Sequence, residues 1–82
     1  MSNFDLAINT DTPEILKRLA DDEIAVRCAV GMNPNTSTET LEHLVNDENY
    51  YVRRYVEINP KTPQYIKQYI KIKKFLGDYE QS

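Results

Sequence analysis

The sequence predicts an all-α fold, in the form of a short α-solenoid of about two to three helical-pair repeats with a period of about 25 residues. The stretch Val52–Thr62 repeats Val26–Thr36, with valine, arginine and an Asn-Pro pair at matching positions. Apolar residues at helical spacing also recur at a similar offset, as Leu16 does at Leu41. Because a single unit of this kind exposes an apolar stripe, successive units must stack to bury it.

Residues 1–9 are expected to form an opening half-repeat. The run from Leu6 to Asn9 aligns with the helix-ending runs 30–33 and 56–59. The chain therefore begins with the second half of a unit, which would act as a cap on the stack.

The first full repeat is expected over residues 10–34. Thr12 can cap a helix whose first position is Pro13. The apolar stripe of this helix is Ile15, Leu16, Leu19 and Ala20. An acidic turn, residues 21–23, then supplies the cap of a second helix over about 23–32, whose inward side is Val26, Ala29 and Val30.

The second full repeat is expected over residues 35–60. Pro34 ends the previous helix, because the residue before a proline is disfavoured in the α region. A capping box then runs to Glu39 from Thr36, with Ser37 as the alternative cap one residue later. Leu41, Leu44 and Val45 repeat the earlier stripe, and Asn46-Asp47-Glu48 repeats the acidic turn.

Residues 61–76 are expected to form a long C-terminal capping helix, with apolar positions that include Ile66 and Ile70. Gly77 is the expected stop. A frayed tail is expected over 77–82. The whole chain is thus predicted to be one domain, 1–82, in keeping with its 82 residues.

Composition excludes several functions. The net charge of −3 argues against general nucleic-acid binding, although residues 61–76 carry five lysines and no acid. Cys28 is the only cysteine and His43 the only histidine, and no metal, phosphate-binding or nucleophile motif occurs. We therefore expect no enzyme activity, no cofactor and no metal. With no leader or membrane-spanning stretch in the sequence, a cytoplasmic protein is expected.

The repeated phrase, Asn33-Pro34 through the leucine pair and acidic turn to Val52-Arg53 and Asn59-Pro60, resembles the leucine-rich repeat variant family over roughly residues 6–70. That resemblance implies a right-handed α-solenoid related in shape to HEAT and armadillo proteins. The cysteine-rich segment that binds an iron–sulfur cluster in one branch of the family has no counterpart here.

Arg27 and Arg53 follow the buried valine of each second helix and have two interpretations. Each can pair with an acidic turn, as in the Asp–Arg ladder between neighbouring units of HEAT-like stacks, because the guanidinium suits bidentate pairing. The alternative places Arg53, together with Arg54, on an exposed groove that contacts a partner.

A protein-binding surface is predicted on the second half of the chain, at Tyr50, Tyr51, Arg53, Arg54, Lys67, Lys71 and Lys74. Tyrosine and arginine concentrate interface energy, and the three lysines share one helix face. The alternative for the lysines is a solvated face that complements the helix dipole.

The favoured hypothesis is therefore a non-enzymatic module that binds a protein of unknown identity. Nucleic-acid binding through the arginines and lysines is a second, less favoured hypothesis. Self-association is a third, since a short stack has open ends and the acidic front could meet the basic tail of another copy.

Overall fold

The computed structural model describes residues 2–77, and that part of the chain forms six α-helices and no strand. The helices are α1 (Asn3–Asn9), α2 (Pro13–Leu19), α3 (Ile24–Met32), α4 (Thr38–Leu44), α5 (Tyr50–Ile58) and α6 (Gln64–Phe75). The predicted all-α class is confirmed for these residues. The tail expected after Gly77, residues 78–82, lies outside the described residues.

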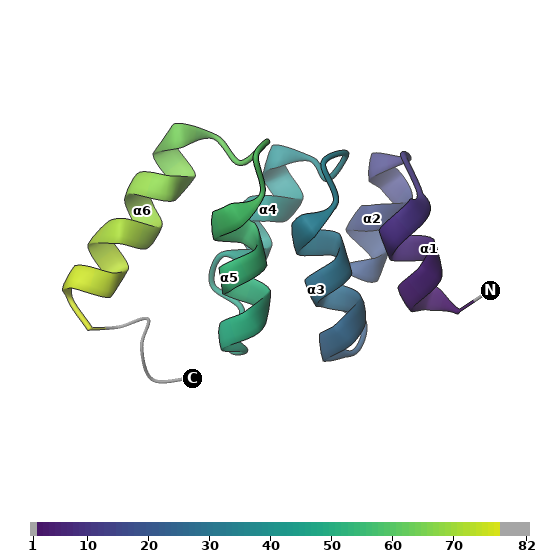
Figure 1. Ribbon diagram of the computed structural model, residues 1–82, viewed down its shortest axis with the longest axis horizontal. Helices are drawn as coiled ribbons and strands as arrows, with labels where there is room; N and C mark the ends of the chain where they lie inside the picture. The colour runs from purple at the N-terminus through teal and green to yellow at the C-terminus, as the bar shows by residue number, and fades with distance from the viewer. Residues whose placement is uncertain (1, 78–82) are drawn as a thin grey trace.

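The helices form two rows and a closing element (Figure 1). Helices α1, α3 and α5 stand side by side in a front row, and α2 and α4 lie behind them. Helix α6 covers the end of the molecule beyond α5. From α1 to α5 the helices therefore alternate between the two rows, and α6 follows as the closing element.

The core lies between the rows and consists of the apolar positions that the helical periodicity indicates. Leu16, Leu41 and Ile66, which align in the sequence, are each almost completely buried in α2, α4 and α6. From the front row, Val30 and Val56 are fully buried. Full burial of a side chain of this size contributes roughly 1.5–3 kcal/mol, so these positions dominate the stability of so small a chain.

The helix starts require two corrections to the sequence analysis. Thr12 is the N-cap residue of α2, but its hydroxyl makes no capping hydrogen bond. Ser37, not Thr36, caps α4, accepting a hydrogen bond from the Thr40 backbone N–H at 3.2 Å. Thr36 is instead buried, and its hydroxyl donates to the Val30 carbonyl at 2.6 Å.

The acidic turn also differs from the expected cap of α3. Glu23 is the N-cap residue and makes no side-chain capping bond. The Asp22 carboxylate accepts a hydrogen bond from the Glu23 N–H at 2.7 Å. This bond stabilises the turn before α3 and does not cap the first turn of the helix. In α5 the cap is conventional, since Asn49 accepts from two N–H groups of the first turn.

Two buried asparagines connect neighbouring front-row helices. The Asn33 side-chain amide donates to the carbonyls of Ala7 at 2.9 Å and Thr10 at 2.8 Å. The Asn59 amide does the same to Gly31 at 2.8 Å and Asn33 at 3.1 Å. Each asparagine therefore satisfies carbonyls near the C-terminal end of the preceding front-row helix, which aligns the row.

Gly31 sets the separation of α3 and α5. A Cβ atom at this position would lie 3.3 Å from the Tyr55 Cβ and 3.4 Å from the Val52 carbonyl oxygen. The absence of a side chain thus permits the close approach of the two helices. At the other glycine, Gly77, the φ of 81° takes the backbone out of α6, as the predicted stop requires.

Candidate protein-binding surface

The front-row helices expose large apolar residues on the side turned away from α2 and α4. Within each helix these residues recur every four positions, with Tyr51 added next to Tyr50 in α5, so they share one side of the helix. The buried residues of α3, Val26 and Val30 among them, lie on its opposite side. We name this surface the front face; it comprises Phe4 and Ile8 of α1, Ile24, Cys28 and Met32 of α3, and Tyr50, Tyr51, Arg54 and Ile58 of α5.

The apolar residues of the front face are substantially exposed. Ile24 is 48% exposed and Ile58 51%, while Phe4, Ile8 and Met32 have similar values. Single exposed apolar residues are ordinary, so the notable feature is that these recur on one side of three neighbouring helices. On chemical grounds the surface suits another protein, because it combines apolar bulk with aromatic and guanidinium groups.

Tyr50 and Tyr51 form the aromatic part of the front face. Their rings meet edge to face, with centroids 5.3 Å apart and planes at 76°. Tyr51 is 63% exposed, the more accessible of the two. An edge-to-face contact of this kind favours one relative arrangement of the two rings, which reduces the conformational entropy that they lose on association.

Arg54 belongs to a charged group at the edge of the front face nearest α6. Its guanidinium donates to Glu57 Oε1 at 3.1 Å, and the Lys74 ammonium contacts both Glu57 oxygens at 2.8 Å. Partial burial acts to raise the pKa of Glu57, but the bonds from Lys74 and Arg54 outweigh it and hold that pKa below the ordinary value. The group carries one net positive charge.

Arg53 lies inside the molecule, at 5% exposure. Its guanidinium donates to the Asp47 backbone carbonyl at 2.7 Å, just as that of Arg27 donates to the Asp22 carbonyl at 2.8 Å. Arg27 also binds the Asp47 carboxylate in bidentate geometry, at 2.8 and 3.1 Å. Burial and these bonds favour a packing role for both arginines, and we leave Arg53 out of the surface.

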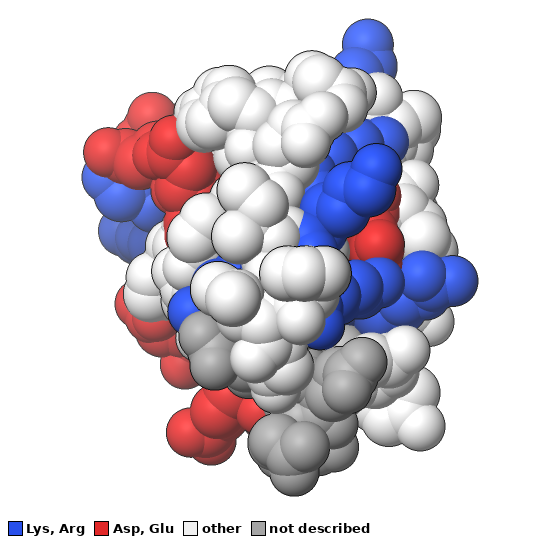
Figure 2. All heavy atoms as spheres, turned by 90° about the vertical axis from the view of Figure 1, so that its left-hand side faces the viewer, with Lys and Arg blue, Asp and Glu red and all other residues white. Residues whose placement is uncertain are grey.

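The predicted lysines lie on α6, next to the α5 edge of the front face, and differ among themselves. Lys71 is exposed, Lys67 is half-buried, and Lys74 is held by Glu57. Lys73 lies 5.8 Å from the Tyr69 ring centroid, a cation–π distance. Figure 2, which looks onto the α6 end, shows most of the basic groups of this view on one side of the molecule and most of the acidic groups on the other.

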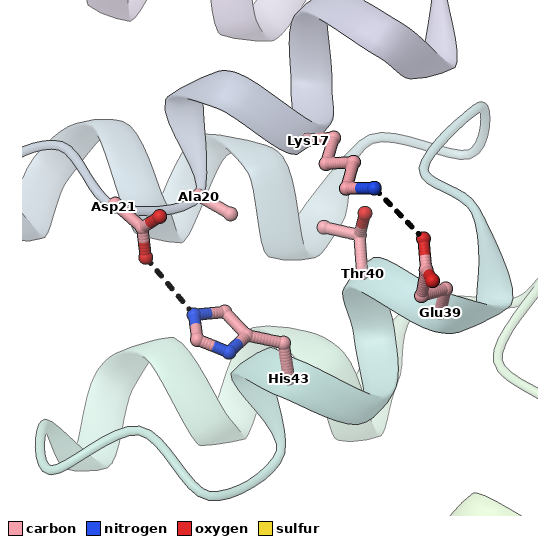
Figure 3. Close-up of a pocket in the computed structure, with 6 residues that line it drawn as sticks. All are labelled: Lys17, Ala20, Asp21, Glu39, Thr40 and His43. Atoms are coloured by element: carbon pink, nitrogen blue, oxygen red, sulfur yellow. Dashed lines mark hydrogen bonds and ion pairs between the residues drawn. The ribbon is translucent and has the colours of Figure 1, made fainter.

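A shallow pocket of about 260 Å³ lies on the back row between α2 and α4. Figure 3 shows how its polar residues face one another across it. Lys17 pairs with Glu39 at 3.3 Å, and His43 with Asp21 at 3.0 Å, all of them well exposed. Because these groups already pair with each other in contact with water, the pocket does not present a nucleophile activated by a base.

A second shallow pocket, of about 240 Å³, lies between α4 and α6 and is bridged in the same manner. The Tyr65 hydroxyl donates to Glu42, and the Tyr69 hydroxyl donates to Asn46 at 2.7 Å. The hydrogen bond to Glu42 raises the pKa of Tyr65. Polar side chains of α4 and of the turn after it thus bond to those of both neighbours, α2 on one side and α6 on the other.

Cys28 sits half-buried at the centre of the front face. Partial burial and the nearby Asp47 raise the pKa of its thiol, although Arg27 opposes them, so the reactive thiolate is disfavoured. Within residues 2–77 no three His, Cys, Asp or Glu side chains gather into a metal-binding group. None of the described helices combines the length and apolar character that crossing a membrane requires.

The sequence analysis missed the apolar part of this surface. Ile8, Met32 and Ile58 align with one another and follow the buried stripe rather than belonging to it. The signal was a large apolar residue kept at aligned positions that the helical periodicity places away from the core.

The chain matches no protein-family model, no curated protein and no solved structure.

Proposed function

We propose that this chain is a non-enzymatic protein-interaction module whose contact surface is the front face. The observation that carries this is the group of exposed apolar side chains across α1, α3 and α5, next to Tyr50, Tyr51 and Arg54. Interfaces of this composition derive most of their binding energy from a few aromatic, arginine and large apolar residues at their centre.

The proposed scaffold is a right-handed α-solenoid with a period of about 25 residues, of the kind that the leucine-rich repeat variant family forms. Recurrent hydrogen bonds support it. Thr36 and Thr62 donate to the carbonyls of Val30 and Val56, at 2.6 and 2.7 Å. The bonds of Asn33 and Asn59 recur at the same offset. Such bonds are what stacked units with one internal geometry require.

A binding role is favoured over catalysis because the polar side chains of the pockets and of the interior already bond to one another or to the backbone. In the pocket between α2 and α4 the acidic and basic groups pair with one another, and in the pocket between α4 and α6 two tyrosine hydroxyls bond to Glu42 and Asn46. The interior arginines are tied to backbone carbonyls. A protein partner is favoured over nucleic acid because Lys74 and Arg54 share Glu57, which reduces the positive charge available to phosphate. A cytoplasmic location remains part of the proposal.

The test compares two half-exposed isoleucines in affinity capture from the native host, with bound proteins quantified by mass spectrometry. Ile58→Glu charges the front face, and Ile72→Glu places the same charge on α6, where Ile72 is 56% exposed. We expect Ile58→Glu to lose the captured protein and Ile72→Glu to retain it, with both variants keeping the helical circular dichroism of the parent. Equal capture by both variants would refute the assigned surface.

A further inference from the structure

The front face extends over all three helices of the front row. The molecule measures 40 × 23 × 16 Å, and the view of Figure 1 is along the shortest of these dimensions, onto the front row. The whole outline in that view is on the order of 900 Å², and the front row occupies the part of it that α6 does not cover. A face of several hundred Å² is comparable with the smaller stable protein interfaces, to which each partner contributes roughly 600 Å² or more.

The two ends of the front row are closed by charged residues. Ala7 and Gly31, both small and buried, occupy aligned positions in α1 and α3, and the aligned position in α5 is Glu57. At the opposite end, the exposed Asp5 of α1 aligns with the fully buried Ala29 of α3. Beyond α1, the Asp5 carboxylate opposes continuation of the row by a further helix, because burying it without a charged partner is costly. At the other end Glu57 is already bound by Arg54 and by Lys74 of α6, which covers that end of the row.

The front face therefore remains as the broad apolar surface of the described residues. Helix α6 also exposes Ile72, Phe75 and Leu76, but these cover only its last turns, whereas the front face spans three helices. Its centre, on α3, carries Ile24, Cys28 and Met32 and no charge. Self-complementarity about a two-fold axis requires such a centre, because each residue on the axis meets its own copy.

We infer that the front face binds the front face of a second copy of this chain, about a two-fold axis parallel to α3. This rests on the proposed function, since it assigns the partner of the same surface. Charge selects the direction of the axis. An axis along the row would place Arg54 against Arg54 of the second copy, which is repulsive. An axis parallel to α3 places α5 against α1 of the second copy.

That arrangement gives complementary contacts along the whole face. Helix α1 contains Asp5 and no basic residue, so it suits the net positive group formed by Arg54, Glu57 and Lys74. Arg54 faces Phe4 of the second copy, an aromatic ring on which a guanidinium can stack. Ile8 faces Ile58 of the second copy, and the α3 residues face themselves.

The first measurement is the mass of the purified chain by sedimentation equilibrium over a wide concentration range. We expect a reversible dimer. Ile58→Glu should weaken it about thirtyfold or more, since the charge is buried twice in each dimer, whereas Ile72→Glu should leave it unchanged. A monomer at every concentration, or a dimer weakened only by Ile72→Glu, would overturn the inference.

The second measurement tests the axis by cross-linking with a short bis-maleimide, in a Cys28→Ser background. We expect Ile8→Cys protein to cross-link to Ile58→Cys protein in a mixture, and neither variant to cross-link to itself. Self-linking of Ile58→Cys without the mixed product would overturn the proposed axis. If the chain is monomeric while Ile58→Glu still loses a different captured protein, the proposed function stands and the self-pairing fails.

Discussion

The front face and the back row expose side chains of different chemistry. Between the back-row helices, Lys17 binds Glu39 and Asp21 binds His43, so exposed polar groups connect one helix to the next. On the front face, Ile24, Met32 and Ile58 are about half exposed with no such bridges among them. The two surfaces therefore have different roles. Bridged polar groups connect neighbouring helices of the same molecule, whereas exposed apolar groups contribute favourable free energy only when another surface covers them.

The largest loss of stability should follow removal of a buried charge, not a change on either surface. Asp47→Ala removes the carboxylate that binds Arg27 at 2.8 and 3.1 Å, with only 9% of the Asp47 side chain exposed. We expect a loss of about 3 kcal/mol in the free energy of unfolding, because the Arg27 charge is left without its carboxylate. Urea denaturation followed by circular dichroism measures it.

Asp21→Ala is the matched control, since the Asp21 side chain is 78% exposed and pairs with His43. It should change the same free energy by less than about 1 kcal/mol. Equal losses in the two variants would show that the interior pair has no special role.

The next effect concerns the contact that aligns the front row. Gly31→Val introduces a Cβ 3.3 Å from the Tyr55 Cβ, and the branched side chain needs still more room. We expect a loss of about 1–3 kcal/mol from overpacking, together with weaker dimerisation as α5 moves relative to α3. Thermal unfolding and sedimentation measure the two effects.

Ala25→Val adds similar bulk at an exposed position of the same helix and should cost only a few tenths of a kcal/mol, roughly its helix propensity. If Gly31→Val is as stable as Ala25→Val, the close approach of α3 and α5 is not required.

A smaller effect is expected from the back-row bridge between Lys17 and Glu39, whose side chains are 62% and 74% exposed. A double-mutant cycle with alanine at both positions should give a coupling of about 0.2–1 kcal/mol in stability and no change in self-association. Loss of the dimer in either single variant would instead place the contact surface on the back row.

The smallest effect should appear as a dependence on pH. Since the pKa of Glu57 is lower in the folded chain than in the unfolded one, Glu57 stabilises the fold above its ordinary pKa. That stabilisation should fall away as the pH drops through the lowered value. Urea unfolding of the parent and Glu57→Gln should therefore differ at neutral pH and converge in acid. A difference that grew in acid would contradict the direction of this pKa shift.

The core and the helix order could be predicted from the sequence because both depend on local periodicity. Leu16, Leu41 and Ile66 are buried as their spacing indicates, and Pro34 and Pro60 follow the ends of α3 and α5. Thr36 could not be assigned in the same way, because a threonine hydroxyl can cap the helix that follows or bond to a carbonyl of the helix that precedes it.

The surface was harder to predict, since composition alone does not distinguish an exposed arginine from a buried one. Arg53 and Arg54 are adjacent, yet the helical rotation between them buries the first and exposes the second. Ile8 and Met32 are recognisable in the sequence as aligned apolar residues, but their exposure is known only once the helices are packed.

The most direct test of the front face as the contact surface is the accessibility of its isoleucine methyl groups to a soluble nitroxide, followed by NMR as the protein concentration rises. Ile24 and Ile58 report on the front face, and the equally exposed Ile72 reports on α6. We expect all three signals to broaden in dilute solution, and the first two to become protected at high concentration while Ile72 stays accessible. Protection of Ile72 alone, or of none of the three, would contradict the account.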